Sequence, residues 1–157
     1  MSTEAPADKT PSRPVVVLMA DDDADDRLLA KDAMVESNLG SELHFVENGE
    51  QLMDYLRRRG KYTDAAAAPR PALVLLDLNM PRKDGREALR ELKSDPDLRK
   101  IPVVVLTTSR ADTDVAKIYE LGANSFISKP FQFEALVTVM KTLALYWFQT
   151  VELPPLK

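Results

Sequence analysis

Short apolar runs alternate along the chain with longer segments of mixed polarity. The runs are rich in Val and Leu and nearly continuous, which is typical of strands that are buried on both faces of a parallel sheet. The pattern therefore predicts strands at residues 15–20, 43–46, 73–76, 103–106 and 125–127.

The segments between these runs carry apolar residues three and four positions apart, which is the spacing of one helix face. Helices are predicted at residues 26–37, 50–59, 85–94, 113–121 and 131–148. In the first of them Leu28, Leu29, Ala33 and Met34 share a predicted face. Strands that alternate with helices in this way predict an α/β fold with a parallel sheet and right-handed crossovers.

The chain divides into three parts. Residues 1–13 are polar and contain proline, so we expect a disordered leader before the folded domain at residues 14–145. Residues 60–71, with the sequence GKYTDAAAAPRP, are too long and irregular for a tight connection and are predicted to form an exposed loop. Residues 146–157 form a C-terminal extension.

The composition narrows the classes of function. The chain has 157 residues and a formal net charge of −4, so we expect no nucleic-acid partner, which would require basic surface. It has no cysteine and one histidine, His44, which excludes disulfides, thiolate metal sites and multi-histidine sites. No apolar run is long enough to span a membrane or has the form of a signal peptide, so we expect no membrane association and a cytoplasmic location.

Polar residues follow four of the predicted strands. Asp21 and Asp22 follow the first, Asp77 follows the third, Thr107 follows the fourth, and Lys129 comes shortly after the fifth. Open parallel sheets bind ligands outside the carboxyl ends of their strands, where the strand order reverses. We therefore expect these side chains to converge on one functional site.

The acids after the first strand suggest a divalent cation. Asp25 and Asp26 are interpreted as helix caps or solvated side chains, because they lie at the predicted start of a helix. Asp21 and Asp22 instead abut a buried strand, where their mutual repulsion needs a partner. A hard cation such as Mg²⁺, which selects carboxylate oxygens, removes this difficulty.

Asp77 ends an otherwise apolar strand, which is costly for a carboxylate that has no partner. A structural alternative is an acid that caps the following loop. Lys129 is suited to pair with Asp77 or to hold a phosphoryl oxygen as a point charge, although an isolated lysine is more often solvated. Thr107 offers a hydroxyl to the same group, although threonine is also common in strands.

Together these residues resemble the receiver domain of two-component response regulators. The resemblance is carried, in this order, by Asp21-Asp22, by Asp77 in the segment DLNMPRKDG, by Thr107 and by Lys129-Pro130. It covers residues 14–145. It implies a flavodoxin-like, doubly wound sheet of five parallel strands in the order 2-1-3-4-5, with helices on both faces.

The resemblance also implies a role for each site residue. Asp77 would be the phosphoacceptor that attacks a phosphohistidine of a sensor histidine kinase. Mg²⁺ would be bound by Asp22, Asp77 and the main-chain carbonyl of Asn79, with Asp21 acting through water. Lys129 would neutralise the phosphoryl group.

The implied switch consists of Thr107, which would close onto the phosphoryl group, and Phe126, which would then turn inward. The Lys129–Pro130 peptide bond would be cis, as is usual in the family. The protein would not be an enzyme with an external substrate, because it would catalyse only its own phosphorylation and dephosphorylation.

The end of the chain and residues 60–71 narrow the resemblance to the small response regulators associated with bacterial phytochromes, which implies a phytochrome as the sensor kinase. In those proteins the C-terminal stretch helps to form a homodimer. The last predicted helix is apolar on more than one side and is followed by Tyr146, Trp147 and Phe148, which favours an interface independently. We therefore predict a homodimer through this helix and residues 146–154; the alternative is a tail that folds back on its own domain.

Two other functions stay open from the sequence. A phosphatase with Asp77 as nucleophile, as in haloacid-dehalogenase-type hydrolases, would need the pattern DxDxT, whereas the sequence here is DLNMP. An unphosphorylated interaction module with the same fold usually lacks the acid pair, the acceptor or the lysine. Few residues follow the last helix, so we expect any output domain to belong to a partner.

Overall fold

The computed structural model describes residues 15–37, 41–108 and 112–154. Parallel strands form one five-stranded sheet in the order β2-β1-β3-β4-β5. The strands are β1 (Val15–Ala20), β2 (Ser41–Val46), β3 (Leu73–Leu76), β4 (Val103–Thr107) and β5 (Ser125–Ser128). The predicted parallel α/β fold and its strand order are therefore confirmed. The order reverses at β1, which pairs with β2 on one side and with β3 on the other.

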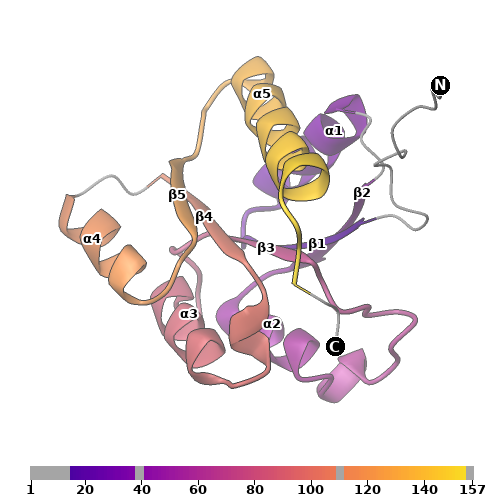
Figure 1. The fold of residues 1–157 in the computed structure, drawn as a ribbon, viewed down its shortest axis with the longest axis vertical. Helices are drawn as coiled ribbons and strands as arrows, with labels where there is room; N and C mark the ends of the chain where they lie inside the picture. The colour runs from indigo at the N-terminus through magenta and orange to yellow at the C-terminus, as the bar shows by residue number, and fades with distance from the viewer. Residues whose placement is uncertain (1–14, 38–40, 109–111, 155–157) are drawn as a thin grey trace, which may run out of the picture.

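Helices cover both faces of the sheet (Figure 1). One face carries α1 (Ala24–Ser37) and α5 (Phe133–Ala144), which lie side by side. The opposite face carries α2 (Gly49–Leu56), α3 (Gly85–Ser94) and α4 (Asp112–Glu120). The loops that follow the carboxyl ends of the strands carry the predicted site.

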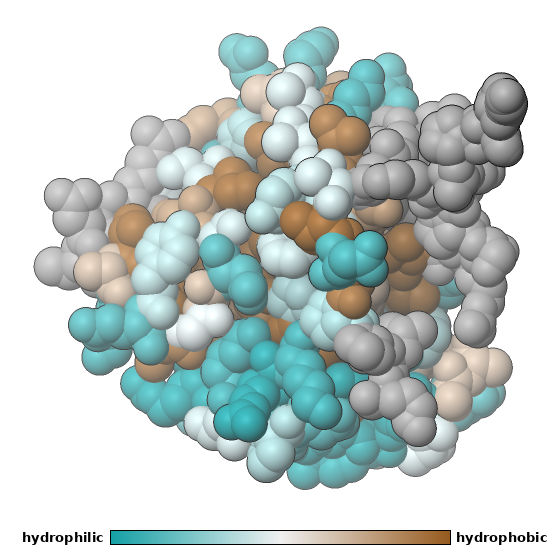
Figure 2. Space-filling view, viewed as in Figure 1, coloured by the Kyte–Doolittle hydropathy of each residue, from teal (hydrophilic) through white to brown (hydrophobic). Residues whose placement is uncertain are grey.

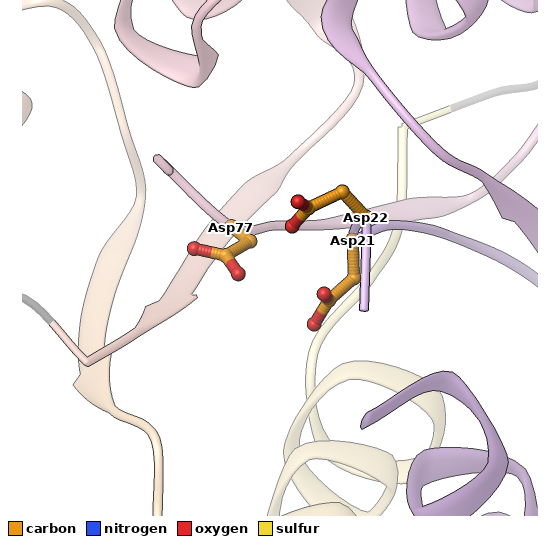
Figure 3. A group of neighbouring side chains, drawn as sticks. All are labelled: Asp21, Asp22 and Asp77. Carbon is orange, nitrogen blue, oxygen red and sulfur yellow. The ribbon is translucent and has the colours of Figure 1, made fainter. Parts of the chain in front are cut away.

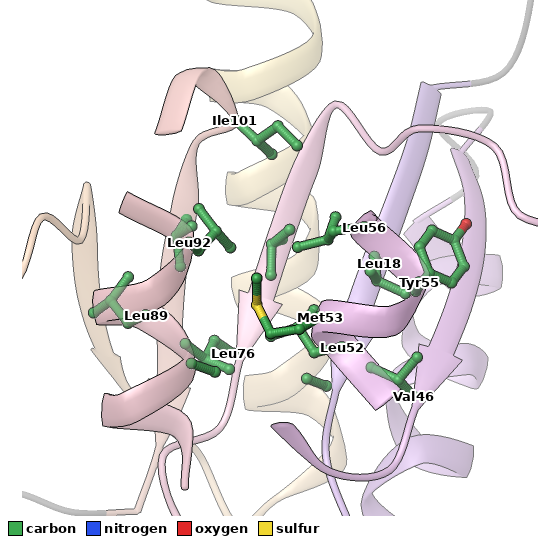
Figure 4. Close-up of a cluster of buried hydrophobic side chains, with 14 of the residues drawn as sticks. Leu18, Val46, Leu52, Met53, Tyr55, Leu56, Leu76, Leu89, Leu92 and Ile101 are labelled. Carbon is green, nitrogen blue, oxygen red and sulfur yellow. The ribbon is translucent and has the colours of Figure 1, made fainter. Parts of the chain in front are cut away.

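The strands are continuous apolar runs because each face of the sheet packs against helices. In β1, Leu18 and Ala20 belong to the core on the α2 and α3 side. Val17 and Met19 alternate with them and belong to the core on the α1 and α5 side. Figure 4 shows the first of these cores, in which α2 and α3 bring their apolar faces against the sheet.

The tail of the chain contributes to the second core. After α5 the chain continues as a short π-helix (Leu145–Thr150). Trp147 and Phe148 are partly buried against the core between α1, α5 and the sheet. Leu145 and Tyr146 are 55% and 50% exposed. Part of the tail therefore folds back on its own domain, while two apolar side chains stay on the surface.

The predicted face of the first helix is correct at Ala33 and Met34 and wrong at Leu28 and Leu29. Leu28 and Leu29 are 57% and 36% exposed, and the buried residues are Ala30, Ala33 and Met34. Apolar residues on two sides of this helix make the face ambiguous in the sequence. The small alanines face the core because α1 packs closely against both the sheet and α5.

Residues 60–71 are exposed over most of their length, as predicted, but part of the segment packs on the domain. They begin with a 3₁₀ turn (Gly60–Tyr62), and Ala68 is only 2% exposed within the core on the α2 side. The Tyr55 hydroxyl donates a hydrogen bond of 2.8 Å to the carbonyl oxygen of Pro69. The segment is therefore fastened to α2 by a buried methyl group and a tyrosine.

The surface mixes apolar and polar side chains. On the face in Figure 2, hydrophobic residues lie scattered among polar ones over α5, and hydrophilic residues gather along the lower part of the view. Individual exposed apolar side chains of this kind are ordinary on protein surfaces. In the described part of the chain, no helix has both the length and the apolar character needed to cross a bilayer.

Candidate functional site

The structure brings the polar strand ends together at one edge of the sheet. Asp21 directly follows β1, Asp77 directly follows β3, Thr107 is the last residue of β4, and Lys129 directly follows β5. All four are buried: their exposed fractions are 0%, 8%, 0% and 7%. The parallel arrangement forces this convergence, since it places the carboxyl ends of neighbouring strands side by side.

Three carboxylates form an oxygen-rich group at this edge. Asp21, Asp22 and Asp77 each offer one carboxylate oxygen, and these oxygens all lie within 4.8 Å of one another. Figure 3 shows the carboxylate of Asp22 turned toward Asp77, with Asp21 beside Asp22. Asp22 is exposed and gives this group access to solvent. Oxygen donors at this spacing suit a hard divalent cation.

Lys129 is the cationic centre of the site. Its Nζ lies 2.7 Å from Oδ2 of Asp21, 2.9 Å from Oδ2 of Asp26 and 3.0 Å from Oδ2 of Asp77. An ammonium group has three N–H donors, so a separate carboxylate accepts each of them. Lys129 thus joins β5, β3 and the first turn of α1.

The second oxygen of Asp77 is held by the neighbouring strand and by its own loop. The Thr107 hydroxyl donates to Oδ1 of Asp77 at 2.8 Å, and the main-chain N–H of Asn79 donates to the same oxygen at 3.1 Å. Both oxygens of this carboxylate therefore have partners. The position of Asp77 is fixed from three elements before any ligand arrives.

Burial and charge shift the proton affinities of the site in a consistent way. Burial raises the pKa of Asp21, and this effect outweighs the hydrogen bonds from Lys129 and from the main chain of Asp23, which lower it. Burial by itself would lower the pKa of Lys129, but its hydrogen bonds to Asp21 and Asp26 outweigh that effect and raise its pKa above the ordinary 10.5. Lys129 is therefore a permanent ammonium ion at neutral pH.

Two glycines position the loop that follows Asp77. At Gly85, a Cβ atom would lie 2.5 Å from the main-chain oxygen of Asp77 and 2.7 Å from Cα of Leu78. At Gly49, the first residue of α2, it would lie 2.1 Å from the main-chain oxygen of Lys83. The N–H of Gly49 donates to that same oxygen at 3.0 Å. The loop is therefore clamped between the starts of α2 and α3.

The structure corrects three expectations about this site. Asp23 caps α1, because its Oδ1 accepts hydrogen bonds from the main-chain N–H groups of Asp25 and Asp26. Asp26 is not a cap or a solvated side chain, since it binds Lys129. The Lys129–Pro130 peptide bond is trans, because none of the described residues has a cis bond. Trans is also the form that an X-Pro bond prefers intrinsically.

Asp26 is the site residue that sequence reasoning missed. A partial signal was present, because Asp26 belongs to the same acidic stretch of sequence as Asp21 and Asp22. Its partner Lys129 is 103 residues away in the chain, and only the fold brings the Lys129 side chain from the end of β5 to the first turn of α1.

This arrangement can hold a divalent cation and present a fixed carboxylate to an electrophile. The Lys129 ammonium and the Thr107 hydroxyl lie on opposite oxygens of Asp77, where they can neutralise charge that develops on an attacking or accepting group. Such a combination suits transfer of a phosphoryl group, which depends mainly on positioning and charge neutralisation.

Comparison with known proteins identifies relatives that share this fold. The sequence matches the family described as the response regulator receiver domain over residues 17–141. The response regulator Rcp1 of Synechocystis sp. is 40% identical over 141 residues, which cover 90% of this chain and 94% of Rcp1. The structure of the Mn²⁺-bound form of Rcp1 has a TM-score of 0.81, and the similarity covers 90% of this chain and 100% of that one.

Two further solved structures are similar over almost their whole length. The phosphorylated cyanobacterial phytochrome response regulator RcpA is 40% identical, with a TM-score of 0.83 over 90% of this chain and 99% of RcpA. RPA3017, a response regulator in red light signaling of R. palustris, is 36% identical, with a TM-score of 0.85 over 90% of this chain and 99% of RPA3017.

Proposed function

Because the chain belongs to the response regulator receiver family, we propose that it accepts a phosphoryl group from a sensor histidine kinase onto Asp77. The observation that carries this proposal is the environment of Asp77, a buried carboxylate between the Lys129 ammonium and the Thr107 hydroxyl. A carboxylate held in this way is preorganised as a nucleophile, and the groups around it neutralise the charge that the transfer brings.

In the proposed reaction a carboxylate oxygen of Asp77 attacks the phosphorus of a phosphohistidine. The bond between phosphorus and the imidazole nitrogen breaks, and its electron pair stays on the nitrogen. Lys129 and Thr107 hold the two oxygens of Asp77, so the acceptor needs little reorganisation before the attack.

The donor set fits Mg²⁺. We propose that Asp22, Asp77 and the main-chain carbonyl of Asn79 bind the ion and that Asp21 acts through water. The support is the group of carboxylate oxygens within 4.8 Å, which are the hard donors that Mg²⁺ prefers. When bound, the ion neutralises charge on the phosphoryl oxygens. The solved Mn²⁺-bound form of Rcp1 supports the proposal that this chain binds a divalent metal.

Thr107 and Phe126 form the proposed switch. New phosphoryl oxygens on Asp77 would compete for the Thr107 hydroxyl, which now donates to Oδ1 of Asp77. Phe126 lies on the neighbouring strand, and its main-chain N–H donates to the hydroxyl of Tyr119 at 3.1 Å. A shift at the end of β4 can therefore reach α4 through β5. Signalling would follow through contacts of partner proteins with the surface formed by α4 and β5.

We propose a phytochrome as the sensor kinase, because RcpA is a phytochrome response regulator and RPA3017 acts in red light signaling. The proposal predicts faster phosphotransfer from a purified phytochrome kinase than from a histidine kinase of another sensor class. Equal rates from both kinases would contradict the assignment of this partner while leaving Asp77 as the acceptor.

The test of the central proposal is incubation with acetyl phosphate and Mg²⁺, followed by intact-protein mass spectrometry. We expect one phosphoryl group per chain in the wild type and none in Asp77→Asn. Asp54→Asn, which changes a surface carboxylate of α2, is the matched control and should be phosphorylated normally. Equal incorporation in wild type and Asp77→Asn would refute the assignment, and continuous turnover of a phosphate ester would favour the phosphatase alternative.

We also propose that the chain forms a homodimer through α5 and residues 146–154. The support is the pair Leu145 and Tyr146, two exposed apolar side chains at the end of α5. Trp147 and Phe148 pack on their own domain, so truncation of the tail would disturb folding as well as association. The sharper variant is the double substitution Leu145→Ser and Tyr146→Ser. Sedimentation should show weaker self-association, and an unchanged monomer–dimer balance would argue against this interface.

A further inference from the structure

In the unphosphorylated protein, each N–H donor of Lys129 already has an acceptor. Its three N–H groups point to Asp21, Asp26 and Asp77, at distances between 2.7 and 3.0 Å. A phosphoryl group on Asp77 adds oxygens that carry more negative charge than the carboxylate they replace. For Lys129 to neutralise them, at least one of its present contacts has to be given up.

The three carboxylates differ in what they lose when Lys129 leaves. The side chain of Asp21 is 0% exposed, so without the ammonium it would be a charge buried away from water. Asp77 carries the phosphoryl group and keeps Lys129 close to it. The side chain of Asp26 is 33% exposed, so water can replace the ammonium there. Of the three contacts, the one to Asp26 is therefore the least costly to release.

We propose that Asp26 is a positioning residue that holds Lys129 away from an incoming phosphoryl group and so slows phosphorylation of Asp77. This inference rests on the proposed function of Asp77 as the acceptor. Asp26 lies outside the group of three acids that offers oxygens to a cation, so its effect is on the lysine. In this proposal the Asp26–Lys129 contact stabilises the unphosphorylated state only, because the contact is absent once Asp77 is phosphorylated.

This role predicts that the two directions of the reaction respond differently. Phosphorylation requires the Asp26–Lys129 contact to break, so removing Asp26 removes part of the barrier. Hydrolysis of the acyl phosphate begins after the contact has broken, so its rate should not depend on Asp26. A general loss of structure would change both rates.

Asp25 provides the matched control. It lies one residue earlier in the same turn of α1, is exposed and carries the same charge, and it is not among the acceptors of Lys129. Asp25→Asn therefore reproduces the change in net charge and in the helix N-terminus without freeing the ammonium. Asp26→Glu keeps a carboxylate and should return the rate toward that of wild type.

The experiment measures phosphorylation by acetyl phosphate at saturating Mg²⁺, then hydrolysis after the donor is removed. We expect Asp26→Asn to be phosphorylated roughly threefold to tenfold faster than Asp25→Asn, the factor for one partly exposed charged hydrogen bond. Its hydrolysis rate should stay within about twofold of wild type, since the phosphorylated states have the same contacts at Lys129.

Three results would overturn the inference: equal phosphorylation of Asp26→Asn and Asp25→Asn, slower phosphorylation of Asp26→Asn, or the same acceleration of phosphorylation and hydrolysis. If wild type is phosphorylated on Asp77 and one of these is seen, the role of Asp26 fails and the proposed function stands. If wild type takes up no phosphoryl group, or Asp77→Asn takes up as much, the proposed function fails and the role of Asp26 fails with it.

Discussion

At Gly85, helix propensity and packing predict opposite effects of an alanine substitution on the stability of the fold. It is the first residue of α3, and in a helix alanine is more favourable than glycine by about 0.5–1 kcal/mol. The site of the missing Cβ is occupied, however. It would lie 2.5 Å from the main-chain oxygen of Asp77, 2.7 Å from Cα of Leu78 and 3.1 Å from the main-chain oxygen of Leu78.

The size of the effect of Gly85→Ala follows from these distances. All three opposing atoms belong to main chain, so no side-chain rotation can make room for the new methyl group. Overpacking of this kind costs about 1–3 kcal/mol. Displacing the loop also weakens the hydrogen bond of 3.0 Å from the N–H of Gly85 to the oxygen of Leu78, a further 0.5–1.5 kcal/mol or so. After the gain in propensity, we expect a net loss of about 2 kcal/mol.

Urea unfolding followed by circular dichroism measures this loss as a lower midpoint at an unchanged slope. The control is Glu87→Ala, an exposed residue of the same helical turn, which should stay within about 0.5 kcal/mol of wild type. Phosphorylation of Gly85→Ala by acetyl phosphate should also fall, because the displaced atoms are the backbone of the acceptor. A variant as stable as wild type, or more stable, would show that propensity decides and would refute the packing argument.

Three further outcomes are expected. Asp22→Asn should abolish the rise in melting temperature that Mg²⁺ gives the wild type, measured by calorimetry with Ca²⁺-free buffers. The hydrogen bond from Lys83 holds the pKa of Glu91 below its ordinary 4.5, so the ionised Glu91 stabilises the fold above pH 4.5. The difference in free energy of unfolding between wild type and Glu91→Gln should therefore shrink as the pH falls through the lowered pKa. Burial raises the pKa of Tyr55 to about 12, so the contribution of this neutral side chain to folding stability is complete below pH 10 and is lost as the pH rises through the raised pKa. At neutral pH, Tyr55→Phe removes the hydrogen bond to Pro69 and should lower the free energy of unfolding in urea by roughly 1 kcal/mol.

The strands and the polar site at their carboxyl ends could be predicted from the sequence because both follow from one physical constraint. A strand buried on both faces must be apolar throughout, so a carboxylate or a hydroxyl at its end marks the edge of the sheet. Asp21, Asp77, Thr107 and Lys129 were predicted to converge, and the structure brings them within hydrogen-bond distance. Their roles in phosphotransfer stay predictions.

The features that the sequence did not yield depend on how distant elements pack. Asp26 was interpreted as a helix-end residue because its local context fits a cap, and only the placement of β5 reveals its lysine partner. Leu28 was assigned to the core because apolar residues occupy two sides of α1, and neighbouring α5 decides which side is covered. Ala68 looks like filler in a run of four alanines, yet it is the one that reaches the core.

Trp147 is the single tryptophan of the chain, and it packs on the α1 and α5 side of the sheet. Its indole emission therefore reports on that layer, whereas Tyr55 and Tyr62 contact each other on the opposite side, with ring centroids 5.3 Å apart. Tyr146 lies edge-on to Trp147 with ring centroids 5.2 Å apart, so tyrosine signals arise on both sides of the sheet, whereas indole emission arises on one. If the halves of the molecule loosen at different denaturant concentrations, indole fluorescence and far-UV circular dichroism will record different transitions, where a single cooperative unit would give coincident ones.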